Sequence, residues 1–308
     1  MRIHCRFEAD EPHRSRLLQR VPGLTFGERI PDPVDVLVHG VPTDAELACI
    51  TPNGSLVVPY AGLATSTRDR LLERPDVAVY NLHHNAGLVA EHTVGLLLAV
   101  VRQIVSADAA MRRGDWRIRY GPDPSPRLFG KRALILGYGA IGHRVGTTLE
   151  ALGMEVVGIR RTQPPTLADV DALLPETRAL IVTLPHTPAT DRWIDARRLA
   201  RLPRDAVVVN VGRGRVIDED ALFEALQSRQ LLGAGIDVWW DYPTSPAARG
   251  AMWPRRPFHE LDNVVLSPHR GAHGAETEAL RFDHLAEVLA TLAAGGTPDT
   301  RVDPGEGY

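Results

Sequence analysis

The residues that could bind a nucleotide form a glycine-rich turn behind an apolar run. Leu134–Leu136 leads into Gly137, Gly139 and Gly142 with the spacing G-x-G-x-x-G, and a helix-like segment follows. In such a turn the first glycine permits a tight bend, the second lets the backbone approach a pyrophosphate, and the third lets the helix pack close to the strand. The helix N-terminus then faces the phosphate charge. The pattern favours a dinucleotide site over a ligand-free glycine turn.

Length and composition limit the kinds of protein this chain can be. Its 308 residues exceed one ordinary domain, which predicts two. A content of 44% hydrophobic and 24% charged residues is typical of a globular chain, and a net charge of −3 is not that of a nucleic-acid binder. Cys5 and Cys49 have no C-x-x-C spacing, so we expect neither disulfides nor a zinc site. With no signal peptide or membrane-length apolar run, we expect a cytoplasmic protein.

The chain before the glycine turn alternates between β-like and helix-like segments. The β-like runs lie at residues 1–7, 34–40, 55–60 and 77–82, and the helix-like segments at 12–20, 43–50 and 65–74. Such alternation predicts a parallel sheet covered by helices, here a small flavodoxin-like domain. Residues 91–113 keep helical apolar spacing and predict one long helix that Gly114 ends, and the proline-rich residues 121–126 form a loop or arm.

The alternation resumes after the glycine turn. Strands are expected near residues 154–159, 179–183, 206–211, 233–238 and 263–267, which completes a Rossmann-type doubly wound domain. A last helix, at about 275–293, has an apolar face and is expected to pack on the first domain, while residues 295–308 form a polar tail without expected structure. We therefore expect a discontinuous substrate domain, residues 1–91 with the return 274–308, around a dinucleotide domain of residues 92–273.

Several ordered motifs resemble the D-isomer-specific 2-hydroxyacid dehydrogenases, from about Val57 to Gly295. The matching segments are residues 85–93 (NAGLVAEHT), 129–132 (FGKR), 183–188 (TLPHTP), 210–214 (NVGRG), 235–238 (GIDV) and 267–269 (SPH). The resemblance implies an NAD(P)-dependent oxidoreductase with the two-domain fold expected above. It also implies the order of the site: a segment that opens the interdomain helix, a loop that lines the cofactor, and the segments with a catalytic arginine and histidine.

The chemistry of that family explains the residue types. Reduction of a small 2-oxo acid such as glyoxylate or hydroxypyruvate places a hydride on C2 and makes the carbonyl oxygen an alkoxide, so the site needs a proton donor and a cation. The resemblance assigns the proton to His269. It assigns the carboxylate and carbonyl to Arg213, whose planar fork meets a carboxylate through two hydrogen bonds. Backbone N–H groups near Ala61 and Gly62 resemble the second set of donors with which the family binds the carboxylate. Asn85 is expected to contact the substrate.

One departure concerns the cofactor. A domain that prefers NAD usually carries an acidic residue after its second strand, whereas here Arg160, Arg161 and Thr162 follow it. Guanidinium groups can bind a 2′-phosphate through charge-assisted hydrogen bonds, so we expect NADP to be preferred, with NAD still accepted, although solvated arginines at a strand end are the alternative. The expected cofactor-binding residues are Gly137, Tyr138, Gly139, Ala140, Ile141, Gly142, Arg160, Arg161, Thr162, Leu184, Pro185, Thr190, Val211, Gly212, Asp237 and Gly271.

A second departure concerns the partner of the catalytic histidine. The family usually has a glutamate five residues after the aspartate that matches Asp237, and here Tyr242 occupies that position. Asp241 lies one residue earlier and, in an extended segment, would point the other way. Either Tyr242 is the catalytic partner, or a local shift lets Asp241 serve. Trp239 and Trp240 either form a wall of the site or belong to the core.

Other hypotheses about the function stay open. Enzymes of this fold also oxidise small anions, so a formate or phosphite dehydrogenase is possible, although Tyr242 stands where formate dehydrogenases carry glutamine. A nucleotide-sensing, corepressor-like binding protein is a third reading, favoured by the missing glutamate. His269 and His273 have a metal-like i, i+4 spacing, but Pro268, Gly271 and Gly274 favour a loop there, so no metal is expected. The resemblance implies a homodimer through residues 91–130, and we expect no nucleic acid or membrane partner.

Overall fold

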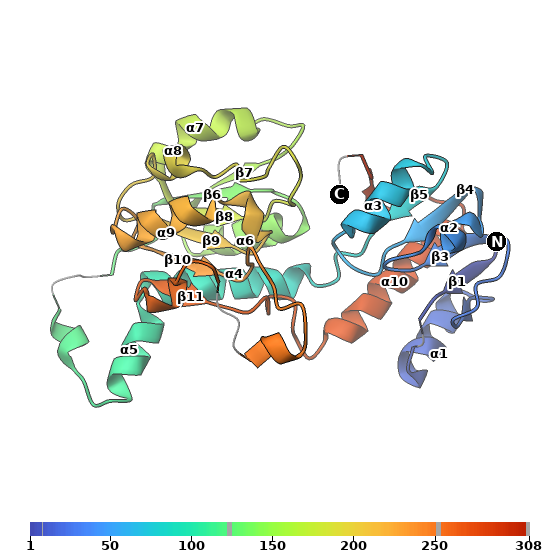
Figure 1. Cartoon of the computed structure of the whole chain (residues 1–308), viewed down its shortest axis with the longest axis horizontal. Coiled ribbons are helices and arrows are strands. Elements are labelled where there is room, and N and C mark those ends of the chain that lie inside the picture. The colour runs from blue at the N-terminus through green and yellow to red at the C-terminus, as the bar shows by residue number, and fades with distance from the viewer. Residues whose placement is uncertain (8, 122–124, 251–253, 306–308) are drawn as a thin grey trace. The chain divides into compact units, whose positions relative to one another are not determined.

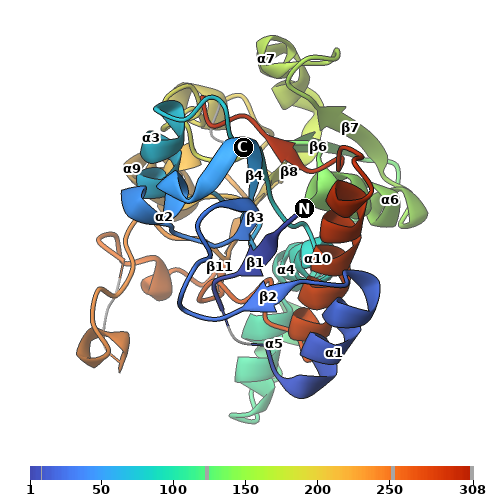
Figure 2. The same ribbon diagram turned by 90° about the vertical axis from the view of Figure 1, so that its right-hand side faces the viewer.

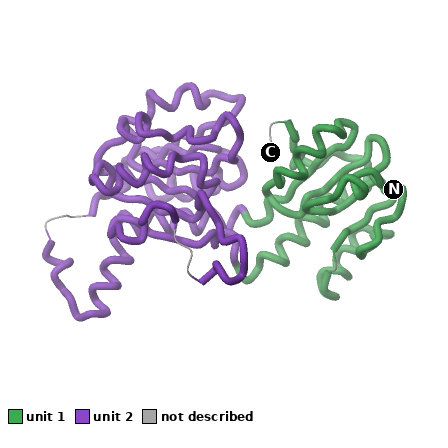
Figure 3. Tube along the Cα trace, viewed as in Figure 1, with its two compact units in different colours: residues 1–85, 274–308 green, residues 86–273 purple. Residues whose placement is uncertain are grey.

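The computed structural model describes residues 1–7, 9–121, 125–250 and 254–305, and they form two compact units. Unit 1 contains Met1–Asn85 and Gly274–Tyr308, and unit 2 contains Ala86–His273, as Figure 3 shows by colour. The sequence places the first boundary after residue 91, within a helix that the structure assigns wholly to unit 2. That helix contacts three strands of the unit 2 sheet, which accounts for the difference.

Unit 1 is a six-stranded sheet covered on both faces. Its elements are β1 (Ile3–Cys5), α1 (Glu11–Arg20), β2 (Thr25–Phe26), β3 (Val34–Val38), α2 (Asp44–Ala48), β4 (Ile50–Val57), α3 (Thr65–Leu72), β5 (Ala78–Tyr80), α10 (Thr277–Ala293) and β12 (Arg301–Val302). The strand order is β12-β5-β4-β3-β1-β2, and only β12 runs antiparallel to its neighbour. This is the flavodoxin-like arrangement that the sequence predicts.

Alternation along the central strand β3 sends side chains into two separate cores. Val36 packs with Leu17 of α1 and Phe282 of α10, whereas the adjacent Leu37 packs with Leu71 of α3. Successive residues of a strand point to opposite faces, so a strand with both faces covered has an unbroken apolar sequence. The helices α1 and α10 lie side by side on one face in both Figure 1 and Figure 2. The chain therefore returns to complete unit 1, as predicted.

Unit 2 is a parallel six-stranded sheet with the order β11-β10-β9-β8-β6-β7. Its elements are α4 (Ala86–Val101), α5 (Ile104–Met111), η1 (Arg117–Tyr120), β6 (Arg132–Leu136), α6 (Ala140–Ala151), β7 (Glu155–Ile159), α7 (Val170–Leu173), β8 (Thr177–Val182), α8 (Ala196–Leu199), β9 (Val207–Asn210), η4 (Gly214–Val216), α9 (Glu219–Gln227), β10 (Gly233–Ile236) and β11 (Val264–Leu266). The chain order switches direction at β6, and ligands bind at such switch points. The Rossmann-type prediction is confirmed.

The first strand of unit 2 is buried on both sides. Ala133 and Ile135 of β6 pack with the core under α4 and α6, whereas Leu134 and Leu136 pack with the core under α7, α8 and α9. All four side chains are fully buried. This burial holds β6 in place, so the glycine turn begins at the end of a rigid strand.

The single helix expected over residues 91–113 is wrong. Two helices, α4 and α5, meet there at a bend of 63°, with Gln103 in the left-handed region at φ 53°. The apolar spacing misled because Ile104 and Val105 of α5 are exposed rather than buried. Within the described ranges, no single helix is long and apolar enough to cross a membrane, and α4 and α5 meet that criterion only as a bent pair.

The C-terminal tail contains a strand that the sequence did not predict. Arg301 pairs with Tyr80 and Val302 with Val79, and this pairing makes β12 the edge of the unit 1 sheet. A strand of two residues carries no periodic signal, so only the long-range pairing could identify it. Residues 122–124 of the expected arm and 306–308 of the expected tail lie outside the described residues.

Candidate active site

The glycine turn has the geometry that a pyrophosphate requires. Gly137 adopts φ +94°, which favours glycine, and a Cβ at Gly142 would lie 2.2 Å from the carbonyl oxygen of Gly137. A Cβ at Gly139, by contrast, would meet nothing within 4 Å. Gly139 caps α6, a helix of 12 residues whose N-terminal N–H groups begin at the turn. The turn thus leaves open space in front of a helix N-terminus, which fits the phosphates of a dinucleotide.

The end of β7 carries a cationic side chain in an ordered position. Arg160 lies with its guanidinium carbon 5.3 Å from the ring centre of Tyr138 and donates a hydrogen bond from Nη1 to Oε1 of Gln163 at 3.2 Å. In the described part of the chain, no carboxylate lies within salt-bridge distance of Arg160. Its charge is therefore available to an anion. Arg161 and Thr162 follow on the exposed surface.

The loops after β8 and β9 are in close backbone contact. A Cβ at Gly212 would lie 2.5 Å from the carbonyl oxygen of Leu184, so only glycine permits this approach. Pro185 and Val211 belong to the same two loops. The Thr190 hydroxyl donates to the Pro185 carbonyl at 2.7 Å, and the Thr187 N–H donates to that hydroxyl at 2.8 Å. Thr190 therefore closes its own loop, and a contact with a cofactor stays a prediction.

Arg213 lies in the turn that follows β9, and the buried side chain of Asn210 holds this turn in place. The Asn210 side chain accepts the Gly212 N–H at 3.1 Å and donates to the Arg213 carbonyl at 3.1 Å. Arg213 is exposed, and its Nη1 donates only to the Gly212 carbonyl, at 2.7 Å. Among the described residues it has no carboxylate partner. The sequence motif contained Asn210, but only the tertiary structure shows that its side chain holds the turn.

His269 follows β11 and lies beside Tyr242, which occupies the position where the resemblance implies a glutamate. Its Nδ1 lies 2.9 Å from the Tyr242 hydroxyl, and that hydroxyl also accepts the Trp239 N–H at 3.1 Å. His269 has φ 59°, which a non-glycine residue adopts only with local support. Because β9, β10 and β11 are adjacent and parallel, their carboxyl ends bring Arg213 and His269 to one edge of the sheet.

Asp237 supplies the support for the His269 loop. Its carboxylate is buried and accepts the Ser267 hydroxyl at 2.5 Å, the Arg270 N–H at 2.7 Å and the Gly271 N–H at 3.0 Å. His92 of α4 extends the cluster, with Nε2 at 3.0 Å from the Ser267 hydroxyl. The carboxylate therefore bonds residues on both sides of His269. Sequence reasoning missed His92 and Ser267 as supports, although both lie in the motifs quoted above.

Burial and neighbouring charges shift the pKa values of His269 and Tyr242. Loss of water lowers the pKa of His269, the Asp237 carboxylate raises it, and the Arg213 charge lowers it, with a net lowering. Burial raises the pKa of Tyr242 above its ordinary value, against the hydrogen bond from Trp239 and the Arg213 charge, which lower it. Tyr242 is thus a neutral phenol at physiological pH. The imidazole of His269 loses its proton more readily than an ordinary histidine.

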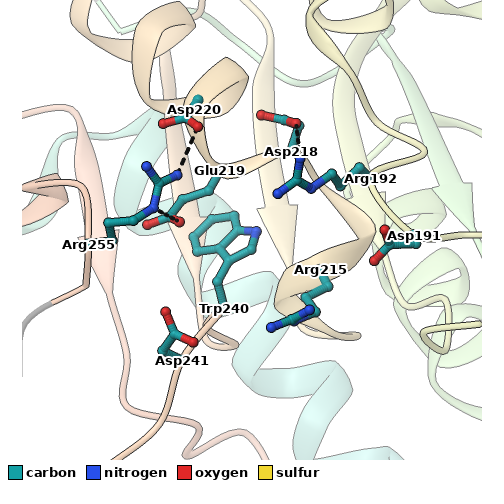
Figure 4. A pocket seen from close by; sticks show the side chains of 9 residues that line it. All are labelled: Asp191, Arg192, Arg215, Asp218, Glu219, Asp220, Trp240, Asp241 and Arg255. Atoms are coloured by element: carbon teal, nitrogen blue, oxygen red, sulfur yellow. Dashed lines mark hydrogen bonds and ion pairs between the residues drawn. The ribbon is translucent and has the colours of Figure 1, made fainter.

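Asp241 belongs to a different part of the surface. It lines a charged cavity of about 310 Å³ with Trp240 and Arg215, and in Figure 4 its carboxylate points into that cavity. The other lining residues are Asp191, Arg192, Asp218, Glu219, Asp220 and Arg255. Between described residues, no hydrogen bond joins Asp241 to His269. The geometry therefore brings Tyr242, and not Asp241, to the imidazole.

The residues that the sequence predicts as binders of the substrate carboxylate lie in unit 1. The loop after β4 is fixed by Asn81, whose Nδ2 donates to the Ala61 carbonyl at 2.8 Å. In the described chain the N–H groups of Ala61 and Gly62 donate to no protein acceptor, so they are free donors. Asn85 ends the first segment of unit 1, and its Oδ1 is buried. Nearby, burial and the charges of Arg281, His284 and His83 lower the pKa of His84 to about 4.

A family model matches the larger part of the chain. Residues 94–271 match the model described as the NAD-binding domain of D-isomer-specific 2-hydroxyacid dehydrogenases. This span covers more than half of the sequence and contains the glycine turn, Arg213 and His269.

Relatives and solved structures agree with that match. The chain is 29% identical over 274 residues to a glycerate dehydrogenase of Methylorubrum extorquens, with 87% of this chain and 85% of that protein covered. It is 32% identical over 308 residues to the D-3-phosphoglycerate dehydrogenase of Mycobacterium leprae, covering 96% of this chain but only 54% of that protein. The chain thus spans about half the length of the phosphoglycerate dehydrogenases that it matches.

The fold also matches a solved structure along its whole length. A D-isomer-specific 2-hydroxyacid dehydrogenase from Xanthobacter autotrophicus Py2, solved with NADPH and MES, superposes with a TM-score of 0.79 at 27% identity, covering 100% of this chain and 99% of the other.

Proposed function

This chain belongs to the D-isomer-specific 2-hydroxyacid dehydrogenases, a family of NAD(P)-dependent oxidoreductases, and we propose that it reduces a small 2-oxo acid to the D-2-hydroxy acid with NADPH. Glyoxylate and hydroxypyruvate are the substrates we favour. Hydroxypyruvate is the 2-oxo acid that corresponds to glycerate, on which the relative from Methylorubrum extorquens acts. The observation that carries the proposal is that Arg213, which has no carboxylate partner among the described residues, and the hydrogen-bonded pair His269–Tyr242 lie at the same edge of the sheet.

Arg213 would bind the substrate carboxylate and polarise the carbonyl. Its guanidinium carries a charge with no protein carboxylate to neutralise it, in the described part of the chain. The Asn210 clamp fixes the backbone from which the side chain extends, which limits the entropy lost on binding. In unit 1, the N–H groups of Ala61 and Gly62 have no acceptor among the described residues and are the donors that we propose for a substrate carboxylate, and Asn85 would contact the substrate.

His269 would deliver the proton to the carbonyl oxygen. In the imidazolium, Nδ1–H donates to the Tyr242 oxygen and Nε2–H is left for the substrate. The phenol oxygen already accepts one N–H from Trp239 and has a second lone pair for Nδ1–H. After proton transfer the neutral ring keeps Nδ1–H and the same hydrogen bond. Tyr242 therefore orients the imidazole without changing its own protonation.

The glycine turn and the end of β7 would hold the cofactor. When bound, NADPH supplies the hydride that reduces C2. The open space at Gly139 would receive the pyrophosphate, and Arg160, with Arg161 and Thr162 beside it, would bind the 2′-phosphate. Asp237 would keep the His269 loop in place beside the nicotinamide end of the site. NADH would bind more weakly because it offers these arginines no phosphate.

We also propose a homodimer in a reducing cytoplasm. The exposed apolar side chains from α5 to the start of β6 form a surface that a second copy would cover; they are Ile104, Val105, Met111, Trp116, Ile118, Tyr120 and Phe129. Both cysteines are free thiols, which suits a reducing compartment. Sedimentation velocity would find a dimer, and a monomer at micromolar concentration would contradict the proposal.

The direct test follows NADPH consumption with glyoxylate, hydroxypyruvate, pyruvate and 2-oxobutyrate, and identifies the enantiomer formed. We expect turnover of at least one acid to the D product. Arg213→Ala should mainly raise KM, whereas His269→Ala should lower kcat by about 10²- to 10⁴-fold, the usual contribution of a placed proton donor. Near-full turnover by the His269 variant would refute the assigned mechanism.

The same preparation separates the alternatives. Formate and phosphite are tested with NADP⁺ and NAD⁺ in the oxidative direction, where NADPH or NADH formation without any 2-oxo acid reduction would favour a dehydrogenase of another anion. Tight NADPH binding with no turnover of any acid would favour a nucleotide-sensing protein.

A further inference from the structure

The ring of Tyr138, inside the glycine turn, fills a space that two glycines leave open. A Cβ at Gly158 of β7 would lie 2.2 Å from ring carbons of Tyr138, and a Cβ at Gly146 of α6 would lie 2.5 Å from its hydroxyl oxygen. Neither glycine has a positive φ, so turn geometry does not require them. Their role is to make room for the aromatic ring between α6 and β7.

The guanidinium of Arg160 lies over the ring that these glycines accommodate. Its Cζ is 5.3 Å from the ring centre, within the range of a cation–π contact. The Gln163 side chain accepts a hydrogen bond from Nη1, and the Arg160 N–H donates to the Pro165 carbonyl at 3.2 Å. An exposed arginine without such contacts would occupy many rotamers and lose that freedom on binding. Here the ring limits the rotamers beforehand.

The surroundings of the ring leave the cation exposed to a ligand. The ring centre of His143 lies 5.6 Å from that of Tyr138, and burial, together with the charge of Glu150 farther along α6, raises the pKa of Tyr138. Arg160 itself is exposed and, in the described residues, pairs with no carboxylate. The ring therefore holds the charge without neutralising it. This charge stands at the carboxyl end of β7, next to the turn that fits a pyrophosphate.

We propose that Tyr138 is a positioning residue for cofactor selectivity, because its ring holds the Arg160 guanidinium where the 2′-phosphate of NADPH is bound. The inference rests on the proposed NADPH preference and adds a residue that does not itself touch the phosphate. It also assigns an indirect role to Gly146 and Gly158. They leave the space that the Tyr138 ring occupies, and that ring orients Arg160.

The test measures binding rather than turnover. Isothermal titration of the full chain with NADPH, NADH and adenosine 2′,5′-bisphosphate is compared for wild type, Tyr138→Leu and Tyr138→Phe. Loss of an exposed cation–π contact should weaken binding of NADPH and of the bisphosphate about two- to fivefold in Tyr138→Leu. NADH binding should stay unchanged, and Tyr138→Phe, which keeps the ring, should match wild type. Tyr138→Met is a second ring-free variant if the leucine variant does not fold.

A double-mutant cycle with Arg160→Leu identifies the route of the effect. If Tyr138 acts through Arg160, Tyr138→Leu should cause no further loss of NADPH affinity once Arg160 is removed. Additive losses, or equal weakening of NADPH and NADH, would overturn the inference and assign Tyr138 a structural role. A wild type that prefers NADPH and a Tyr138→Leu variant with the same preference would overturn the inference alone. A wild type that binds NADH as tightly as NADPH would overturn the proposed cofactor as well.

Discussion

Replacing Tyr242 by glutamate should raise the pKa of His269 and extend reduction to higher pH. The wild-type partner is a neutral phenol 2.9 Å from Nδ1. A carboxylate at ~4 Å in an effective dielectric of ~20 would favour the imidazolium by about 4 kcal/mol, or about three pKa units. Loss of water around the carboxylate opposes part of this gain. We therefore expect a rise of about one to three units, the usual range for an opposite charge at this distance.

The assay is the pH dependence of kcat/KM for 2-oxo acid reduction. Reduction needs protonated His269, so activity is full below the pKa and falls as the pH rises through it. Burial and the Arg213 charge hold the pKa of wild-type His269 below its ordinary value of about 6.5, which sets the wild-type decline in the acid range. In Tyr242→Glu the decline should move upward by the same amount as the pKa. An NMR titration of the His269 ring measures that pKa independently.

Two control variants assign the effect. Tyr242→Phe removes one neutral hydrogen bond and should lower turnover about two- to tenfold with little shift of the profile. Asp241→Asn should change neither, because Asp241 lines the separate cavity of Figure 4. If Asp241→Asn shifts the profile and Tyr242→Phe leaves both turnover and profile unchanged, Asp241 is the partner of His269 and our reasoning is refuted.

Three further changes test the supports of the site. Ser267→Ala removes a hydrogen bond to the buried Asp237 carboxylate and should lower the free energy of unfolding by about 1.5–3 kcal/mol, measured by urea denaturation, and lower kcat without moving the pH profile. Phe258→Ala should cost about 3–5 kcal/mol in the same measurement, because this fully buried ring stacks on Trp240; a loss under about 1 kcal/mol would show that the core closes over the gap. Gly142→Ala should abolish NADPH binding in a titration, since its Cβ would lie 2.2 Å from a carbonyl oxygen of the turn, and unchanged affinity would contradict the assigned role.

The sequence alone determined the fold class and pointed to the residues that we propose for the site. Apolar runs with both faces buried, such as β6, leave few alternatives to a helix-covered parallel sheet, and the glycine spacing of the turn follows from backbone geometry. Local rules of this kind can be read from neighbouring residues. They could not show the bend at Gln103 or the pairing of β12, because a left-handed residue and a two-residue strand leave no periodic signal.

Only the tertiary structure decided which side chain meets His269. Asp241 and Tyr242 are adjacent in an irregular loop, where no strand or helix period sets their directions. The loop is instead anchored by its two tryptophans: the Trp239 indole donates to the Ser267 carbonyl at 2.9 Å, and the Trp240 indole donates to the Ile217 carbonyl at 2.7 Å. These contacts join segments that are distant in sequence. They fix the backbone that turns Asp241 into the charged cavity and the phenol of Tyr242 toward the imidazole.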